Sequence, residues 1–191
     1  MSIPADPGAE RRPVTPEPPV GEAAERDEVD RIVAGWTQAR GDLDIAPLAV
    51  FSRISRLSRF LESARREAFT AAGLEGWEFD MLSALRRSGD DALSPGELMR
   101  QTLVTSGTMT TRIDKLVARG LVSKARSPRD GRAVEVRLMP EGTARVDAAM
   151  AALLASEREL LGPLGAEQEQ ALAATLRRLL LTFEAEEPPR G

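Results

Sequence analysis

Apolar residues recur every three or four positions along most of the chain, which predicts a largely helical protein. A short amphipathic helix is predicted over residues 27–39. A longer helix is predicted to begin at Pro47, which suits a first helical turn, and to end before Gly73. The apolar stripes behind these two predictions are Val29, Ile32, Val33 and Trp36, then Val50, Ile54, Leu57, Leu61, Ala64 and Ala68.

Two short helices joined by a tight break are predicted to follow a third helix over residues 77–87. Ser94 and Glu97 form a capping box that opens the first of them, which runs to about Leu103. The second follows a short polar break at residues 104–107, extends to residue 119 and ends at a glycine. Its predicted buried face consists of Met109, Ile113, Leu116 and Val117. This pair predicts a helix-turn-helix.

Alternating apolar and polar residues then predict a β-hairpin from residues 121–125 and 133–138. Its tip, residues 127–132, is rich in turn formers and carries two arginines. A short strand or turn is expected at residues 90–93. A helix-turn-helix followed directly by a basic hairpin is a winged helix, so the predicted fold class is mainly α with a small β-hairpin wing.

Two Leu- and Ala-rich helices complete the chain, over residues 140–156 or beyond and 166–183. The first 22 residues hold six prolines and few large apolar side chains, so they cannot offset their ordering entropy by burial. The expected parts are a tail (1–26), an extra helix with a first dimerisation helix (27–75), the winged helix-turn-helix (76–139), C-terminal dimerisation helices (140–185) and a short tail (186–191).

The composition removes several kinds of chemistry. With no Cys and no His, the chain has no thiol nucleophile, no Ser-His-Asp relay and no Cys/His zinc site. No spacing suggests a catalytic carboxylate pair, so we expect neither an enzyme nor a cofactor. No stretch approaches the roughly 20 apolar residues of a membrane span, and no signal peptide is recognisable. We expect a cytoplasmic protein.

The net charge of −4 hides an uneven distribution. Residues 94–140 carry nine basic and four acidic side chains, a balance of +5, between acidic flanking segments. A local positive field of this kind attracts a phosphate backbone, although it is also compatible with an ordinary solvated face. The basic block coincides with the predicted winged helix.

Polar side chains on the helix-turn-helix and the wing are the candidates for DNA contact. Hydroxyls and long cations read base edges or bind phosphates from the major groove, and an arginine at a hairpin tip enters the minor groove. Asp130 is suited to orienting Arg132 by a charge-assisted bond, or to stabilising its own turn. The predicted DNA-binding residues are Ser94, Thr105, Ser106, Thr108, Thr111, Arg112, Lys115, Arg129 and Arg132.

The apolar stripes of residues 47–72 and of the last two helices exceed what a winged-helix core covers. Such an excess indicates a homodimer, with packing inside the chain as the alternative. A two-fold dimer would place two recognition helices about one helical turn apart on double-stranded DNA.

These features together resemble the MarR family of transcriptional regulators. The resemblance covers residues 28–185 and is strongest in 94–142. It rests on the helix order, the Ser94 capping box, residues 106–116, the Gly120-Leu121-Val122 step and the Ser-Pro-Arg-Asp-Gly-Arg wing. The family implies a homodimeric repressor that binds a pseudo-palindromic operator and releases it on binding a small molecule. Family wings commonly carry Asp-Arg-Arg, where this chain has Gly131 in the middle position.

The helix that carries Trp36 resembles the extra N-terminal helix of the urate-responsive branch, which includes regulators answering to trans-aconitate. That resemblance implies a ligand site made of Trp36, Asp80, Arg112 and Lys124, for a small anion such as urate or a polycarboxylate. Lys124 stands where the branch has an arginine, so it keeps the charge and loses the bidentate geometry. Trp36 could equally anchor its helix on the dimer, and Asp80 could be a buried ion-pair partner of Arg112.

The sequence therefore predicts a DNA-binding regulator, most simply a ligand-responsive repressor. The alternative is a nonspecific architectural DNA-binding protein, or a helical protein-interaction module without a regulatory ligand.

Overall fold

The computed structural model describes residues 26–89, 92–126 and 133–184. The chain divides into two compact units, residues 1–54 and 55–191, and each is described by itself. The predicted tails lie outside the described residues, except for residue 26 of the first. So does the wing tip, residues 127–132, which includes Arg129, Asp130 and Arg132.

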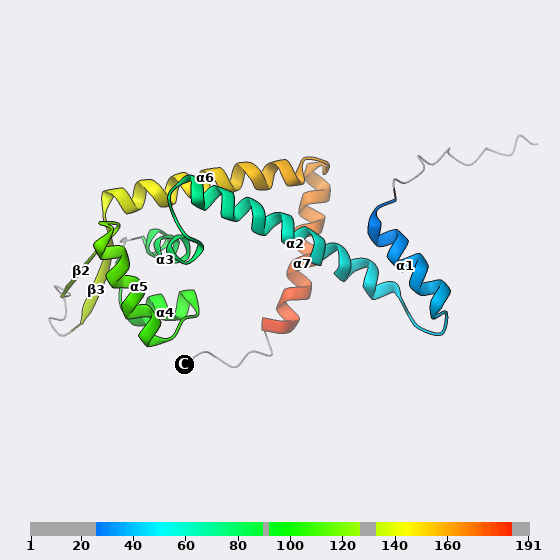
Figure 1. The fold of residues 1–191 in the computed structure, drawn as a ribbon, viewed down its shortest axis with the longest axis horizontal. Coiled ribbons are helices and arrows are strands. Elements are labelled where there is room, and N and C mark those ends of the chain that lie inside the picture. Colours follow the sequence, from blue (N-terminus) through cyan, green and yellow to red (C-terminus); the bar gives the residue numbers. More distant parts are fainter. Residues whose placement is uncertain (1–25, 90–91, 127–132, 185–191) are drawn as a thin grey trace, which may run out of the picture. The chain divides into compact units, whose positions relative to one another are not determined.

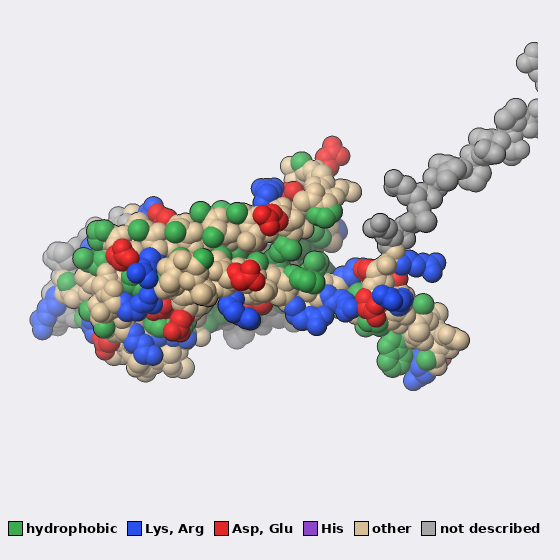
Figure 2. Space-filling view, turned by 45° about the horizontal axis from the view of Figure 1, so that its top comes forward, with side chains coloured by type: hydrophobic (Ala, Val, Ile, Leu, Met, Phe, Trp, Pro, Cys, Tyr) green, Lys and Arg blue, Asp and Glu red, His purple; other side chains and the backbone are tan. Residues whose placement is uncertain are grey.

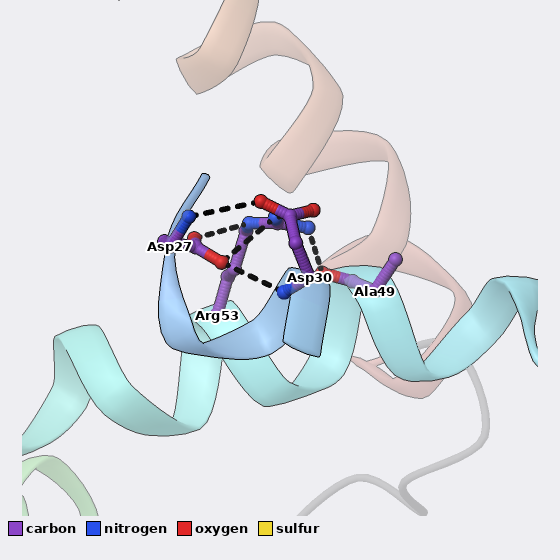
Figure 3. A network of polar contacts seen from close by, with 4 residues as sticks. All are labelled: Asp27, Asp30, Ala49 and Arg53. Atoms are coloured by element: carbon purple, nitrogen blue, oxygen red, sulfur yellow. Dashed lines mark hydrogen bonds and ion pairs between the residues drawn. The ribbon is translucent and has the colours of Figure 1, made fainter. Parts of the chain in front are cut away.

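The first unit contains α1 (Glu28–Ala39) and the start of α2 (Ala46–Ala71), which continues into the second unit. Asp27 and Asp30 close a capping box at the start of α1. Both carboxylates also accept hydrogen bonds from the Arg53 guanidinium, at 2.7–3.0 Å (Figure 3). A third Arg53 nitrogen donates to the Ala49 carbonyl within α2. Arg53 thus connects the first turn of α1 to α2.

The second unit opens with the rest of α2 and with α3 (Gly76–Arg87). Phe69 at the end of α2 stacks on Phe79 of α3, with ring centroids 4.0 Å apart. The centre of the core lies on α3, where Met81, Leu82 and Leu85 have no exposed surface. Helix α3 packs against the helices of residues 95–102 and 140–161 and against two strands of the sheet (Figure 1).

The helix-turn-helix consists of α4 (Pro95–Thr102) and α5 (Ser106–Ala118). The predicted capping box is confirmed, since the Ser94 hydroxyl accepts from the Glu97 N–H and the Glu97 carboxylate accepts from the Ser94 N–H. Met109, Ile113 and Leu116 are buried as predicted. The prediction for Val117 was wrong: its side chain is 39% exposed, because it lies one position beyond the face that α5 turns to the core.

Gly120 ends α5 with a positive φ of 68°. This left-handed conformation costs glycine nothing, and it lets the Leu121 N–H bond back to the Leu116 carbonyl. Leu121 is thereby tied to the helix end and buried, so the strand begins one residue later than predicted, as β2 (Val122–Arg126).

The sheet has three strands in the order β1-β3-β2, all antiparallel. The hairpin of β2 with β3 (Val134–Leu138) pairs Val122 with Leu138 and Lys124 with Val136. The predicted short strand is β1 (Ala92–Leu93), which pairs with the outer edge of β3. The two-stranded wing predicted from sequence is therefore joined to the segment before α4.

Helix α6 (Pro140–Leu161) leaves β3 directly, and α7 (Ala166–Glu184) follows it (Figure 1). Gly142 in the first turn of α6 is buried against the Leu121 carbonyl, where a β-carbon would overlap the oxygen. Helix α7 has no buried residue. Hydrophobic side chains lie open on the surface of the second unit (Figure 2).

Within the described part of the chain, no helix has the length and apolar character needed to cross a membrane. Those same residues contain no group of three or more Asp or Glu side chains placed to hold a metal ion.

Candidate DNA-binding face and ligand cavity

Helix α5 presents a polar outer face made of the residues predicted from sequence. Thr105, Ser106, Thr108, Thr111 and Lys115 are exposed, and Arg112 is half-buried. Thr105 donates to Thr108 at 3.1 Å and Thr111 donates to the Gly107 carbonyl, so these hydroxyls are held close to the helix. The remaining capacity of the hydroxyls and the exposed ammonium of Lys115 suit base edges and phosphates.

Ser94 differs from these residues, because its hydroxyl is used inside the molecule. It accepts from Glu97 N–H at 3.2 Å and donates to the Glu97 carboxylate at 2.7 Å. The Ser94 backbone N–H and then the Ser94 hydroxyl donate to the Glu97 carboxylate and hold the pKa of Glu97 below its ordinary value. Ser94 therefore caps the start of α4.

The aromatic ring of Trp77 lies beneath the two cations of α5. The Arg112 guanidinium carbon is 5.2 Å from the ring centroid and the Lys115 ammonium is 6.0 Å from it. The indole N–H donates to the Glu75 carboxylate at 2.6 Å, which fixes the plane of the ring. These distances are within the range of cation–π contacts.

A cavity of about 630 Å³ lies between the end of α2, the start of α3 and α5. Its charged lining combines three arginines with three carboxylates, namely Arg65, Arg66, Arg112, Glu62, Glu75 and Asp80. Two of the predicted ligand residues, Asp80 and Arg112, therefore line one cavity. Trp77, rather than Trp36, is the indole present in its wall.

The charges in the cavity are not paired as the sequence suggested. Asp80 has a side chain 54% exposed and faces Arg65 at 3.8 Å, so a buried Asp80–Arg112 ion pair, one of the two interpretations of Asp80, is wrong. Among the residues that the structure describes, neither Arg66 nor Arg112 has a carboxylate partner. Two arginines are thus available to an anion in this cavity.

The other two predicted ligand residues lie elsewhere. Lys124 on β2 points its ammonium at Asp114 of α5, 3.4 Å away, and does not line the cavity. Trp36 belongs to the first unit and is 50% exposed there, beside Ile32 on α1. Trp36 lies in the first unit and the cavity in the second, so the structure does not test whether Trp36 contributes to the site.

Sequence reasoning missed Arg65 and Trp77. Neither Arg65 nor Arg66 was among the residues predicted to bind a ligand. Trp77 appeared only as the start of a helix, although a large aromatic residue at a polar helix start is an unusual choice for a core. The adjacent arginines Arg65 and Arg66 were the signal in the sequence that could have indicated the cavity.

Comparison with known proteins identifies the family. Residues 72–133 match the model of the MarR family. The chain is 33% identical over 153 residues to the transcriptional regulator PecS of Dickeya dadantii, covering 80% of this chain and 92% of PecS. It is 28% identical over 148 residues to the transcriptional repressor NicR of Pseudomonas putida, covering 75% of this chain and 92% of NicR.

Solved structures share the fold. BpsR of Bordetella bronchiseptica, whose DNA binding is regulated by 6-hydroxynicotinic acid, is 26% identical with a TM-score of 0.54, over 68% of this chain and 91% of BpsR. These relatives are regulators rather than enzymes. With its winged helix-turn-helix and a PecS-like sequence over four fifths of its length, the chain belongs to the MarR family of DNA-binding transcriptional regulators.

Proposed function

We propose that this regulator is a homodimeric repressor that binds a pseudo-palindromic operator and is released from it by a small anion. The observation that carries the proposal is the position of Arg112, which belongs both to the outer face of α5 and to the cavity wall. One side chain is thus available to a phosphate or base on one side and to a ligand on the other.

The charges of the cavity support an anionic ligand. Arg66 and Arg112 lack carboxylate partners within the described residues, and a bound carboxylate or urate-like anion would supply them. Asp80 would orient a polar group of the ligand or, through Arg65, hold a third cation in place. The relative BpsR, which answers to a hydroxylated aromatic acid, supports the same class of ligand.

Sharing Arg112 couples the two sites. A ligand that draws this guanidinium into the cavity removes it from the DNA face, so ligand and DNA each weaken the binding of the other by the same factor. The expected ligands are urate or a polycarboxylate such as trans-aconitate. The repressor assignment is supported by the name of the relative NicR.

The dimer is proposed from the apolar surface of α7. Its leucines and Phe183 are 37–64% exposed, and no residue of this helix is buried. A helix this apolar on one side is stabilised by a second copy. The wing residues Arg129 and Arg132, oriented by Asp130, are proposed as minor-groove contacts.

A gel-shift titration on the DNA upstream of the gene tests the proposal, followed by addition of urate, trans-aconitate or citrate. We expect Arg66→Ala to bind DNA normally and to resist release, because Arg66 lines the cavity and is not on α5. Arg59→Ala, an exposed arginine of the same helix outside the cavity, is the matched control.

Two results would contradict the proposal. Binding to every duplex with equal affinity would favour the architectural alternative. Release by the anions that is equally efficient in Arg66→Ala and the unsubstituted protein would remove the cavity as the ligand site. Trp36→Ala, measured in the same assay, tests whether α1 contributes to the ligand set.

A further inference from the structure

The contact between Trp77 and α5 joins two elements that lie in different parts of the sequence. Trp77 is the second residue of α3, and its partners Arg112 and Lys115 are on the recognition helix. They lie three residues apart on α5, which places them on one face of the helix. The ring supports both from the same side.

The ring is itself held in place. Its N–H donates to the Glu75 carboxylate at 2.6 Å, and its apolar edge packs on the hydrophobic core. A rigid aromatic platform restricts the rotamers of the long cationic side chains above it. Restricting them before DNA binds lowers the entropy lost when they reach the phosphates.

Trp77 also borders the DNA side of α5. A hollow of about 400 Å³ beside this helix is lined by Trp77, Gly107, Thr108, Thr111, Arg112 and Lys115. Four of these residues are predicted DNA contacts, and Trp77 is the wall residue contributed by another helix. The indole therefore lies next to the surface that meets the duplex.

We propose that Trp77 is a positioning residue for DNA binding, which holds the Arg112 and Lys115 cations over its ring and directs them at the phosphate backbone. This role rests on α5 being the recognition helix. It requires an aromatic face at position 77, and the bond to Glu75 makes tryptophan better than phenylalanine, because only the indole N–H is anchored.

The first test compares Trp77→Leu and Trp77→Phe for binding to a short mixed-sequence duplex at several salt concentrations. We expect Trp77→Leu to bind about tenfold more weakly, the loss expected from two partly exposed cation–π contacts. Trp77→Phe, which keeps the aromatic face, should recover most of that loss. Circular dichroism and thermal unfolding of both variants establish that the fold is retained.

A double-mutant cycle separates positioning from a general structural effect. If Trp77 acts through Arg112 and Lys115, Trp77→Leu costs little in a chain that already carries Arg112→Ala and Lys115→Ala. In an Arg59→Ala background, where neither partner is removed, the full loss should remain. Equal losses in both backgrounds would overturn the proposal.

Fluorescence supplies a readout that packing alone would not change. The chain has two tryptophans, so Trp36→Phe leaves Trp77 as the sole emitter. Its emission should change when phosphates of the duplex approach the two cations held over the ring. Normal binding without any change in emission contradicts the role of Trp77 alone, whereas no binding to any duplex contradicts the proposed function as well.

Discussion

Glu78 of α3 accepts a hydrogen bond from the Arg119 guanidinium at the end of α5, and the carboxylate is almost fully buried. The same carboxylate accepts the Glu75 N–H at 2.9 Å. Arg119 in turn donates to the Gly73 carbonyl at 2.7 Å. These bonds fasten the loop between α2 and α3 to the last turn of the recognition helix.

Removing the carboxylate should destabilise the fold. We expect Glu78→Ala to lower the free energy of unfolding by about 2 to 3 kcal/mol, since two hydrogen bonds to a buried charged group are lost and Arg119 keeps some access to water. Glu62→Ala, whose partner Arg65 is 3.9 Å away and whose side chain is 71% exposed, should change it by less than about 0.5 kcal/mol. Urea denaturation of the two variants measures the difference, and similar losses would contradict this account.

Gly142 is required by a close approach of two backbones. A β-carbon there would overlap the Leu121 carbonyl, which accepts the Met139 N–H and cannot move without opening the start of α6. We expect Gly142→Ala to cost about 2 kcal/mol or more. Gly96→Ala is the control, because its nearest neighbour would be 3.9 Å away, and it should stabilise α4 by up to about 1 kcal/mol. Thermal unfolding of both variants measures these changes in stability. A Gly142→Ala variant as stable as the unsubstituted protein would show that α6 can shift away from Leu121 without cost.

Lys115 should contribute to DNA affinity mainly through a phosphate. Its ammonium is exposed and has no carboxylate partner within the described residues. When it binds a phosphate, about one counterion is released from the DNA. Lys115→Ala is expected to reduce the slope of log affinity against log salt by about one. Fluorescence anisotropy with a labelled duplex gives that slope, and Arg59→Ala should leave it unchanged. A loss of affinity with an unaltered slope would point to a base contact instead.

The exposed leucines of α7 should be buried in the dimer. Leu176→Glu is expected to produce monomers, because a carboxylate would replace an apolar side chain at the contact. Gln170→Glu adds the same charge at an exposed position of the same helix and should remain dimeric. Sedimentation velocity distinguishes the two, and weaker operator binding should accompany monomer formation. A dimeric Leu176→Glu variant would exclude this part of α7 from the interface.

Arg53 of α2 is bonded to Asp27, Asp30 and the Ala49 carbonyl, and this network should make the attachment of α1 to α2 depend on pH. The hydrogen bond from Arg53 holds the pKa of Asp27 below its ordinary value. A lowered carboxyl pKa contributes stability above the unfolded-state pKa, and this is lost as the pH falls through the lowered value. In Arg53→Gln the pKa of Asp27 should return toward normal, as measured by NMR titration of the carboxyl group.

Hydrogen exchange supplies the second readout of that network. Amides of α1 should exchange faster in Arg53→Gln than in Arg56→Gln, which changes an arginine of the same helix that makes none of the bonds to Asp27 and Asp30. Equal exchange in the two variants would show that Arg53 does not hold α1.

The sequence by itself determined the order and the approximate ends of the helices and of the hairpin. Amphipathic spacing, the Ser94 capping box and the glycine stops act within a few residues of one another, so they are readable without knowing the fold. The basic block of residues 94–140 was equally visible, and it fell on the helix-turn-helix and the hairpin.

Only the tertiary structure decided which side chains meet. The contacts that decide the fold and the site join residues separated by 15 to 45 positions. They are the pairing of β1 with β3, the contact of the buried Glu78 with Arg119, the contact of Asp80 with Arg65 and the position of Trp77 under Arg112. Periodicity shows which face of a helix is apolar but not which partner covers it, because that choice depends on how the helices pack. The indole of Trp77 in the cavity wall could not be read from the sequence for the same reason.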